Sequence, residues 1–164
     1  MGADLYIRSL SEPAKAKYEP LFMKAVKVRD SLPQDEAHAI ERAKAQEKVS
    51  KYYDLMYSKG YYRDSYNVTS VMWRMDLSWW QDVGKMLNKK GELCPSKAKR
   101  LLKLIQSREV QPMTAEEIKE KHGTVDDGDN SPEKWLECWQ KQRLELIKFL
   151  QTAILKKESI RCSI

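Results

Sequence analysis

The sequence predicts an all-α protein: a compact single domain over residues 1–164, built as a bundle of roughly six or seven helices. Three observations predict this fold class. Apolar residues recur with a 3.6-residue period over several long stretches, serine and proline stand where these stretches begin, and glycine often stands where they end. Two long segments, near 34–59 and 132–158, are expected to be the scaffold on which the shorter helices pack. A chain of 164 residues can bury a core without disulfides or metals.

The first third of the chain contains two expected helices. Residues 1–11 are interpreted as an extended lead-in, with room for one short strand, because apolar and polar residues alternate loosely there. Helix signals begin at Ser11, and Pro20 is expected to kink this first helix or divide it in two. The long segment 34–59 follows, and Gly60 is its natural stop.

The rest of the chain shows further helical signals after an aromatic break. A helical run is expected over 68–87, with a break near Asp76, and a basic amphipathic helix is expected to begin at Pro95. A short capped helix should then run from Thr114 to His122. An acidic loop over 124–131, the final long helix and a frayed tail over 159–164 complete the expected order. No internal repeat of 20 to 50 residues interrupts this order.

Aromatic residues concentrate in one part of the chain, since nine of the fifteen lie between Tyr52 and Trp80. The break there reads Gly60-Tyr61-Tyr62-Arg63-Asp64-Ser65-Tyr66-Asn67. Tyrosine and tryptophan combine apolar area with a polar tip, and an arginine among them can hold a phosphate while a ring stacks on the aromatics. The predicted ligand-binding residues are Tyr61, Tyr62, Arg63, Asp64, Tyr66, Asn67, Arg74 and Trp80.

The same residues also fit an internal role. In that interpretation Asp64 caps a helix, Arg63 pairs with a carboxylate, and the aromatic side chains belong to the core. Aromatic side chains at helical spacing are more often packed than exposed to a ligand, so both interpretations remain open at this level.

Basic residues form a second concentration. The chain carries a formal net charge of +6, and residues 85–108 hold eight Lys or Arg against the single Glu92. Lys97, Arg100 and Lys103 lie three residues apart on one side of the expected helix, where they could follow phosphates. The strip shows no base-reading pattern, so nonspecific nucleic-acid binding is the hypothesis here. A solvated helix face is the alternative.

Several classes of protein lack their usual signals. The sequence shows no transmembrane stretch and no secretory signal, so a cytoplasmic setting is expected, with no membrane partner. Three widely spaced cysteines form no CxxC pair, and the acidic loop fits no EF-hand register, so we expect no metal and no cofactor. Neither His38 nor His122 has a nucleophile at a recognisable spacing, and we therefore expect no catalytic residues and no enzyme.

Three segments carry a resemblance: residues 1–6 (MGADLY), 60–67 (GYYRDSYN) and 77–83 (LSWWQDV). The chain resembles a group of small bacterial and phage proteins that have no established activity. The resemblance implies a bacterial or viral source, and the cytoplasm of the bacterium or of the phage host. It transfers no functional residues.

Three function hypotheses follow from these observations. The first is a non-catalytic binder of a small anionic, nucleotide-like ligand, which in a phage setting could sequester a signal. The second is a protein-interaction module or inhibitor that uses the aromatic loop, with a homodimer through the exposed middle of segment 34–59 as one form. The third, ranked behind them, is a nonspecific nucleic-acid binder using residues 85–108.

Overall fold

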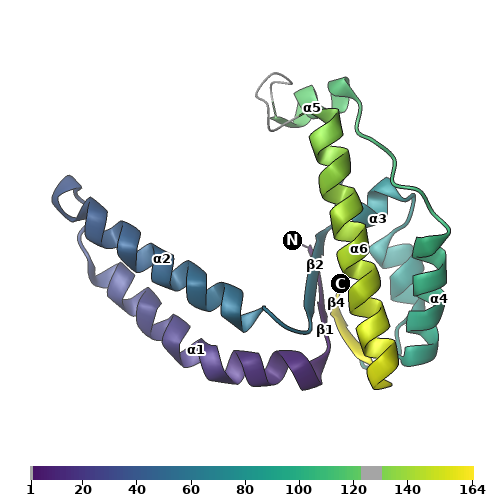
Figure 1. The fold of residues 1–164 in the computed structure, drawn as a ribbon, viewed down its shortest axis with the longest axis horizontal. Coiled ribbons are helices and arrows are strands. Elements are labelled where there is room, and N and C mark those ends of the chain that lie inside the picture. Colours follow the sequence, from purple (N-terminus) through teal and green to yellow (C-terminus); the bar gives the residue numbers. More distant parts are fainter. Residues whose placement is uncertain (1, 123–130) are drawn as a thin grey trace. The chain divides into compact units, whose positions relative to one another are not determined.

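The computed structural model describes residues 2–122 and 131–164, so the expected acidic loop lies outside the described residues except for Ser131. Figure 1 shows the order of helices and strands along the chain. The chain separates into two compact units. Unit 1 comprises Met1–Leu5 and Tyr62–Ile164, and unit 2 comprises Tyr6–Tyr61.

The prediction of an all-α fold is wrong, because the described residues include a four-stranded sheet with the order β2-β1-β4-β3. The strands are β1 (Gly2–Tyr6), β2 (Tyr61–Ser65), β3 (Glu92–Leu93) and β4 (Ile160–Ser163). They occupy the expected lead-in, the aromatic loop, a turn and the expected frayed tail. Each strand is short and pairs with strands far away in sequence, so local patterns carry little sign of it. The protein is a helix-rich mixed α/β protein.

One face of the sheet is buried, as the alternating exposure of its residues shows. The buried strand residues are Ala3, Leu5, Tyr62, Asp64, Leu93, Ile160 and Cys162. β3 and β4 run antiparallel, with Leu93 opposite Ile160. The ring of Tyr62 lies 6.1 Å from that of Phe149 in α6 (Pro132–Lys156), so α6 contributes to the cover of this face.

The helices of unit 1 pack around α6. α4 (Pro95–Gln106) and α3 (Val71–Arg74) both contact it, and α5 (Ala115–His122) follows α4 in sequence. These segments agree with the expected helices at 95, 114–122 and 132–158. The run over 68–87 is interrupted near Asp76, as expected. The part after the break is not one regular helix, because it forms the π-helical turn η2 (Trp79–Val83) and the 3₁₀ turn η3 (Gly84–Met86). The break falls at Asp76, whose φ of 55° ends α3.

Unit 2 is a pair of packed helices, α1 (Arg8–Ser31) and α2 (Ala39–Met56), joined by the 3₁₀ turn η1 (Glu36–His38). α1 begins before Ser11 and continues through Pro20, so the expected division of this helix is absent. Gly60 closes the unit with φ of 64° and accepts a hydrogen bond from Ile7 N at 2.8 Å. A Cβ there would lie 2.6 Å from Leu10 Cβ, so only glycine fits.

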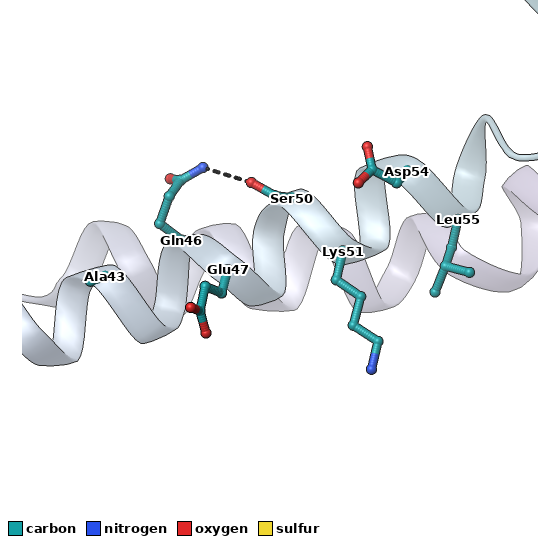
Figure 2. A pocket seen from close by; sticks show the side chains of 7 residues that line it. All are labelled: Ala43, Gln46, Glu47, Ser50, Lys51, Asp54 and Leu55. Carbon is teal, nitrogen blue, oxygen red and sulfur yellow. Dashed lines mark hydrogen bonds between the residues drawn. The ribbon is translucent and has the colours of Figure 1, made fainter.

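Few side chains of unit 2 are buried, because two helices alone form only one narrow contact. The buried apolar residues along the helices are Ala25, Ala45, Val49 and Met56. Much of α2 is polar and exposed, as Figure 2 shows for a shallow pocket where Gln46 donates to Ser50 Oγ at 3.3 Å. No helix in residues 2–122 or 131–164 combines the length and apolar character needed to cross a membrane.

Candidate functional site

Asp64, one of the predicted ligand-binding residues, lies in the interior of unit 1 with 6% of its surface exposed. Its carboxylate accepts hydrogen bonds from five groups. The donors are the Ser70 hydroxyl (2.6 Å), the Trp79 indole (2.8 Å) and the backbone N–H groups of Ser65 (2.8 Å), Val71 (3.1 Å) and Met72 (3.3 Å). These bonds tie β2 to the start of α3 and to η2, so the carboxylate organises the backbone here.

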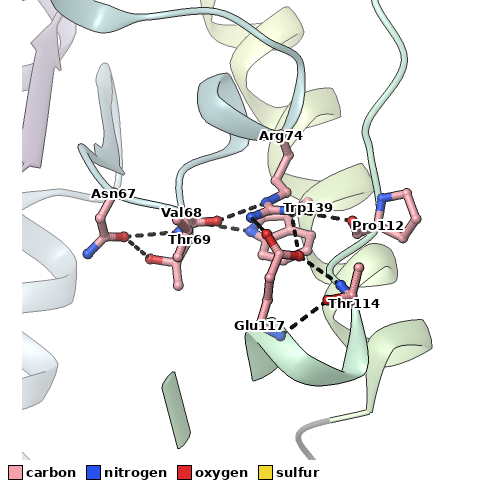
Figure 3. A network of polar contacts seen from close by, with 8 residues as sticks. All are labelled: Asn67, Val68, Thr69, Arg74, Pro112, Thr114, Glu117 and Trp139. Atoms are coloured by element: carbon pink, nitrogen blue, oxygen red, sulfur yellow. Dashed lines mark hydrogen bonds and ion pairs between the residues drawn. The ribbon is translucent and has the colours of Figure 1, made fainter. Parts of the chain in front are cut away.

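Arg74 is likewise engaged inside unit 1, with 5% of its surface exposed (Figure 3). Its Nε donates to Val68 O at 2.9 Å, and Nη1 donates to Pro112 O at 3.3 Å. Nη2 lies 3.4 Å from Glu117 Oε1, and the guanidinium lies 5.1 Å from the ring centre of Trp139. The guanidinium therefore holds α3, the 107–114 connection, α5 and α6 together.

Glu117 is held by two partners in the same network. The Thr114 backbone N–H donates to Glu117 Oε2 at 2.8 Å, and the capping box is closed by a bond from Glu117 N to Thr114 Oγ1 at 3.2 Å. The bond from Thr114, followed by the bond from and charge of Arg74, lowers the pKa of the Glu117 carboxyl, and burial opposes this shift. The sequence predicted this capping box but not its pairing with Arg74.

Four other predicted residues lie at separate places. Tyr61 belongs to unit 2, where its ring lies 4.5 Å from that of Tyr57. Tyr62 is buried and Arg63 is exposed, with Arg63 Nε 3.7 Å from an Asp4 oxygen. Asn67 is exposed, and its Oδ1 accepts a bond from Thr69 Oγ1 at 2.6 Å, which shapes the turn before α3. The remaining two predicted residues, Tyr66 and Trp80, lie together as an aromatic pair.

Tyr66, which is half-buried, and Trp80, which is exposed, form that aromatic pair on unit 1. Their ring centres lie 5.5 Å apart, the planes are tilted by 41°, and 60% of the surface of Trp80 is exposed. The Tyr66 hydroxyl donates to Ser163 O at 3.4 Å, which fixes one end of the pair on β4. Partial burial, followed by the charge of Asp4, raises the pKa of Tyr66, and Arg63 opposes this shift.

A basic groove of about 630 Å³ begins at Gln81, the residue that follows Trp80 in the sequence. We define the basic groove by its lining residues: Gln81, Asp82, Lys85, Met86, Lys97, Arg100, Lys103, Leu104 and Ser107. One wall comes from η2 and η3, and the other comes from one side of α4. The opposite side of α4, which includes Leu101 and Ile105, is buried, so packing in the core turns the basic side outward.

The charges of the basic groove are unbalanced. Four basic side chains, Lys85, Lys97, Arg100 and Lys103, line it together with one carboxylate. Asp82 accepts a hydrogen bond from Ser78 N at 2.7 Å and so caps η2. Within residues 2–122 and 131–164, none of the four cations forms an ion pair. The groove can therefore attract an anion without first losing an internal partner.

The sequence analysis identified half of this groove. The strip 85–108 pointed to Lys97, Arg100 and Lys103, and the same strip contains Lys85. Gln81 and the η2 wall were not predicted, because a helical period over 68–87 was expected instead of the tight π-helical and 3₁₀ turns. The available signal for η2 was Ser78, whose side chain accepts a hydrogen bond from Gln81 N and so caps the backbone that follows.

The three cysteines carry free thiols. A hydrogen bond with the Ser96 hydroxyl, then one from the Lys97 backbone, lowers the pKa of Cys94 at the start of α4. Burial raises the pKa of Cys162 to about 12. In the part of the chain that the structure describes, no group of His, Cys, Asp or Glu is arranged to hold a metal.

Comparisons with known proteins add no identity. No protein-family model matches the chain, and no curated protein or solved structure matches it either. The resemblance carried by residues 1–6, 60–67 and 77–83 therefore stays a prediction.

Proposed function

We propose that the protein is a non-catalytic binder of single-stranded nucleic acid, which it holds by its phosphates in the basic groove without reading sequence. The observation that carries this proposal is a set of four cations that line one groove from two sides and form no ion pair with any residue that the structure describes. A phosphate chain laid along them releases its counterions, which is the main source of affinity in nonspecific binding. Three of the four are lysines, which act as point charges and do not select a base.

The pair of Tyr66 and Trp80 supports binding of a single strand over a duplex. Trp80 is followed directly by Gln81, which lines the basic groove, so the pair and the groove meet at consecutive residues. Unpaired bases stack on such rings while the phosphates follow the cations, whereas paired bases are not available for stacking. Tyr66 and Trp80 thus keep the ligand-binding role predicted for them.

The form of the groove also bears on the size of the ligand. Sites for small molecules enclose most of the ligand surface. Three of the four cations in this groove have exposed side chains, namely Lys85, Arg100 and Lys103. A chain of phosphates can engage several such charges at once, and a mononucleotide reaches fewer of them. The small anionic ligand of the first hypothesis remains a distinct outcome of the test below.

The test measures the affinity of a labelled oligothymidylate of about 20 nucleotides by fluorescence anisotropy over a range of salt concentrations. Wild type should bind with an affinity that falls steeply with salt, by about 0.7 in logarithmic slope for each phosphate contact. The double variant Arg100→Glu, Lys103→Glu should bind at least about 10-fold more weakly, with a shallower slope. A matched duplex should bind more weakly than the single strand.

The matched control is Lys141→Glu, Lys148→Glu on α6, which changes the net charge equally at two exposed positions outside the groove. It should retain most of the affinity. Equal loss in both double variants would show that net charge, and not the groove, governs binding, and the proposal would fail. Displacement of the oligonucleotide by a nucleoside triphosphate at equal phosphate concentration would instead favour a small anionic ligand.

A further inference from the structure

Unit 2 carries a second groove, which has a different character. It lies between α1 and α2 and has a volume of about 490 Å³. Ala25 and Ala45 lie in it, one on each helix, and both are buried. Leu21 and Val28 also line it, with 41% and 50% of their surfaces exposed. Because Leu21, Ala25 and Val28 are spaced by four and then three residues, they form one stripe along α1.

This stripe has the shape that a third helix requires. Small alanines between two helices let another helix approach closely, and the larger side chains on either side then pack against it at an axis distance of about 8–10 Å. The groove continues along α1 from Leu21 to the C-cap residue Leu32, a rise of about 16 Å or three helical turns. A pair of helices buries little apolar surface by itself, so a third packed element would bury most of the apolar surface left on this face.

The charged side chains around the stripe carry an excess of positive charge. Lys24, Lys44 and Lys48 line the groove against the single carboxylate of Glu41. All four side chains are exposed, and within the described residues none of the three lysines forms an ion pair. The complement of this surface is an apolar helix face with carboxylates along its flanks.

We propose that this groove, called here the hairpin groove, binds an amphipathic α-helix of a partner protein that carries acidic residues beside its apolar stripe. The apolar stripe would cover Ala25, Ala45 and Val28, and its carboxylates would meet Lys44 and Lys48. A second copy of this chain is the poorer occupant. A two-fold contact through the hairpin groove would bring one lysine rim against the other, and like charges oppose that contact.

The test uses the full chain and two synthetic helical peptides of about 18 residues. Both peptides carry the same leucine stripe, and their flanking positions hold glutamate in one and lysine in the other. Isothermal titration calorimetry should show that the glutamate peptide binds at least about 10-fold more tightly than the lysine peptide. Val28→Glu should weaken binding of the glutamate peptide at least about 10-fold, because it puts a charge in the apolar stripe.

Charge-reversal variants separate peptide binding in the hairpin groove from attraction by the overall charge of the protein. The variant Lys44→Glu, Lys48→Glu should reverse the preference, so that the lysine peptide binds more tightly. The matched control Lys27→Glu, Lys51→Glu, at exposed positions outside the hairpin groove, should keep the original preference. Circular dichroism confirms that each variant keeps its helices, and unchanged binding of oligothymidylate separates this groove from the basic groove.

Two results would overturn the proposal. One is equal binding of the two peptides, or of the glutamate peptide to wild type and Val28→Glu. The other is a dimer of the full chain, seen by sedimentation equilibrium and abolished by Val28→Glu, which would make a second copy the occupant.

Discussion

The interior around Asp64 and Arg74 and the basic groove both contain charged side chains, but these side chains are in opposite states in the two regions. In the interior, charged groups are buried and engaged by several partners each, as the five donors to Asp64 illustrate. In the groove, the cations have no ion pairs among the described residues and keep their charge available. The comparison shows that charge type and aromatic neighbours along the sequence do not tell an engaged charge from an available one, whereas burial and the number of partners do.

Because of this difference, substitutions in the two regions should affect stability and oligonucleotide affinity separately. Changes in the interior should reduce the free energy of unfolding and leave the intrinsic affinity for oligonucleotide nearly unchanged. Changes at the groove and its aromatic pair should do the reverse. Each of the following measurements can break or sharpen this division.

The largest effect is expected for Asp64→Ala. This change leaves five donors in unit 1 without their acceptor, so the free energy of unfolding should fall by about 3–5 kcal/mol. Urea unfolding followed by tryptophan fluorescence measures it. Glu109→Ala, at an exposed acidic position, serves as the control and should change stability by less than about 0.5 kcal/mol. A similarly small change for Asp64→Ala would refute its structural role.

Arg74→Lys should cost somewhat less, about 2–4 kcal/mol of unfolding free energy. Lysine keeps the charge but cannot reproduce the forked bonds to Val68 O, Pro112 O and Glu117. Thermal unfolding gives the stability, and anisotropy at a temperature where the variant is folded gives the affinity. We expect oligothymidylate binding within about twofold of wild type. A folded Arg74→Lys protein that no longer binds would move the ligand site back to the aromatic segment.

Trp80→Ala tests the aromatic side of the groove. Because 60% of its surface is exposed, the change should cost little stability, whereas loss of one stacked base should weaken binding by about 1–3 kcal/mol. Anisotropy and urea unfolding on the same sample measure both quantities. Trp73→Ala is the matched control, since Trp73 is 54% exposed, belongs to α3 and is not part of the Tyr66–Trp80 pair. Equal losses in affinity for the two variants would remove the special role of Trp80.

The smallest effect is expected at Glu117. Its folded pKa lies below the usual value, so the stabilisation that it provides is present above the pKa of the unfolded chain and is lost as the pH falls through the folded pKa. The carboxylate is 39% exposed, so Glu117→Gln should cost below about 1 kcal/mol at pH 7. Urea unfolding from pH 7 to about pH 3 should show this difference shrinking as the pH falls below the usual glutamate pKa of about 4.3. A difference that grows in acid would contradict the assigned pairing.

Local signals accounted for much of the helical structure. Proline at the start of α4 and α6, and the capping box before α5, predicted where these helices begin, because caps act within a few residues of sequence. The strip 85–108 predicted the basic side of α4 for the same reason. In segment 68–87 the break expected near Asp76 is present, but the apolar period after it gave no sign that the backbone forms a π-helical turn.

The amino-acid sequence by itself determined the long helices, the aromatic segment and the local excess of positive charge, because each depends on spacing along a few turns of chain. Only the tertiary structure decided that four short strands form a sheet and that Asp64 and Arg74 lie inside. It also decided that Lys85 of η3 faces the same groove as Arg100 of α4. These outcomes depend on contacts between residues distant in sequence, where burial and competing partners set whether a charge is engaged or available.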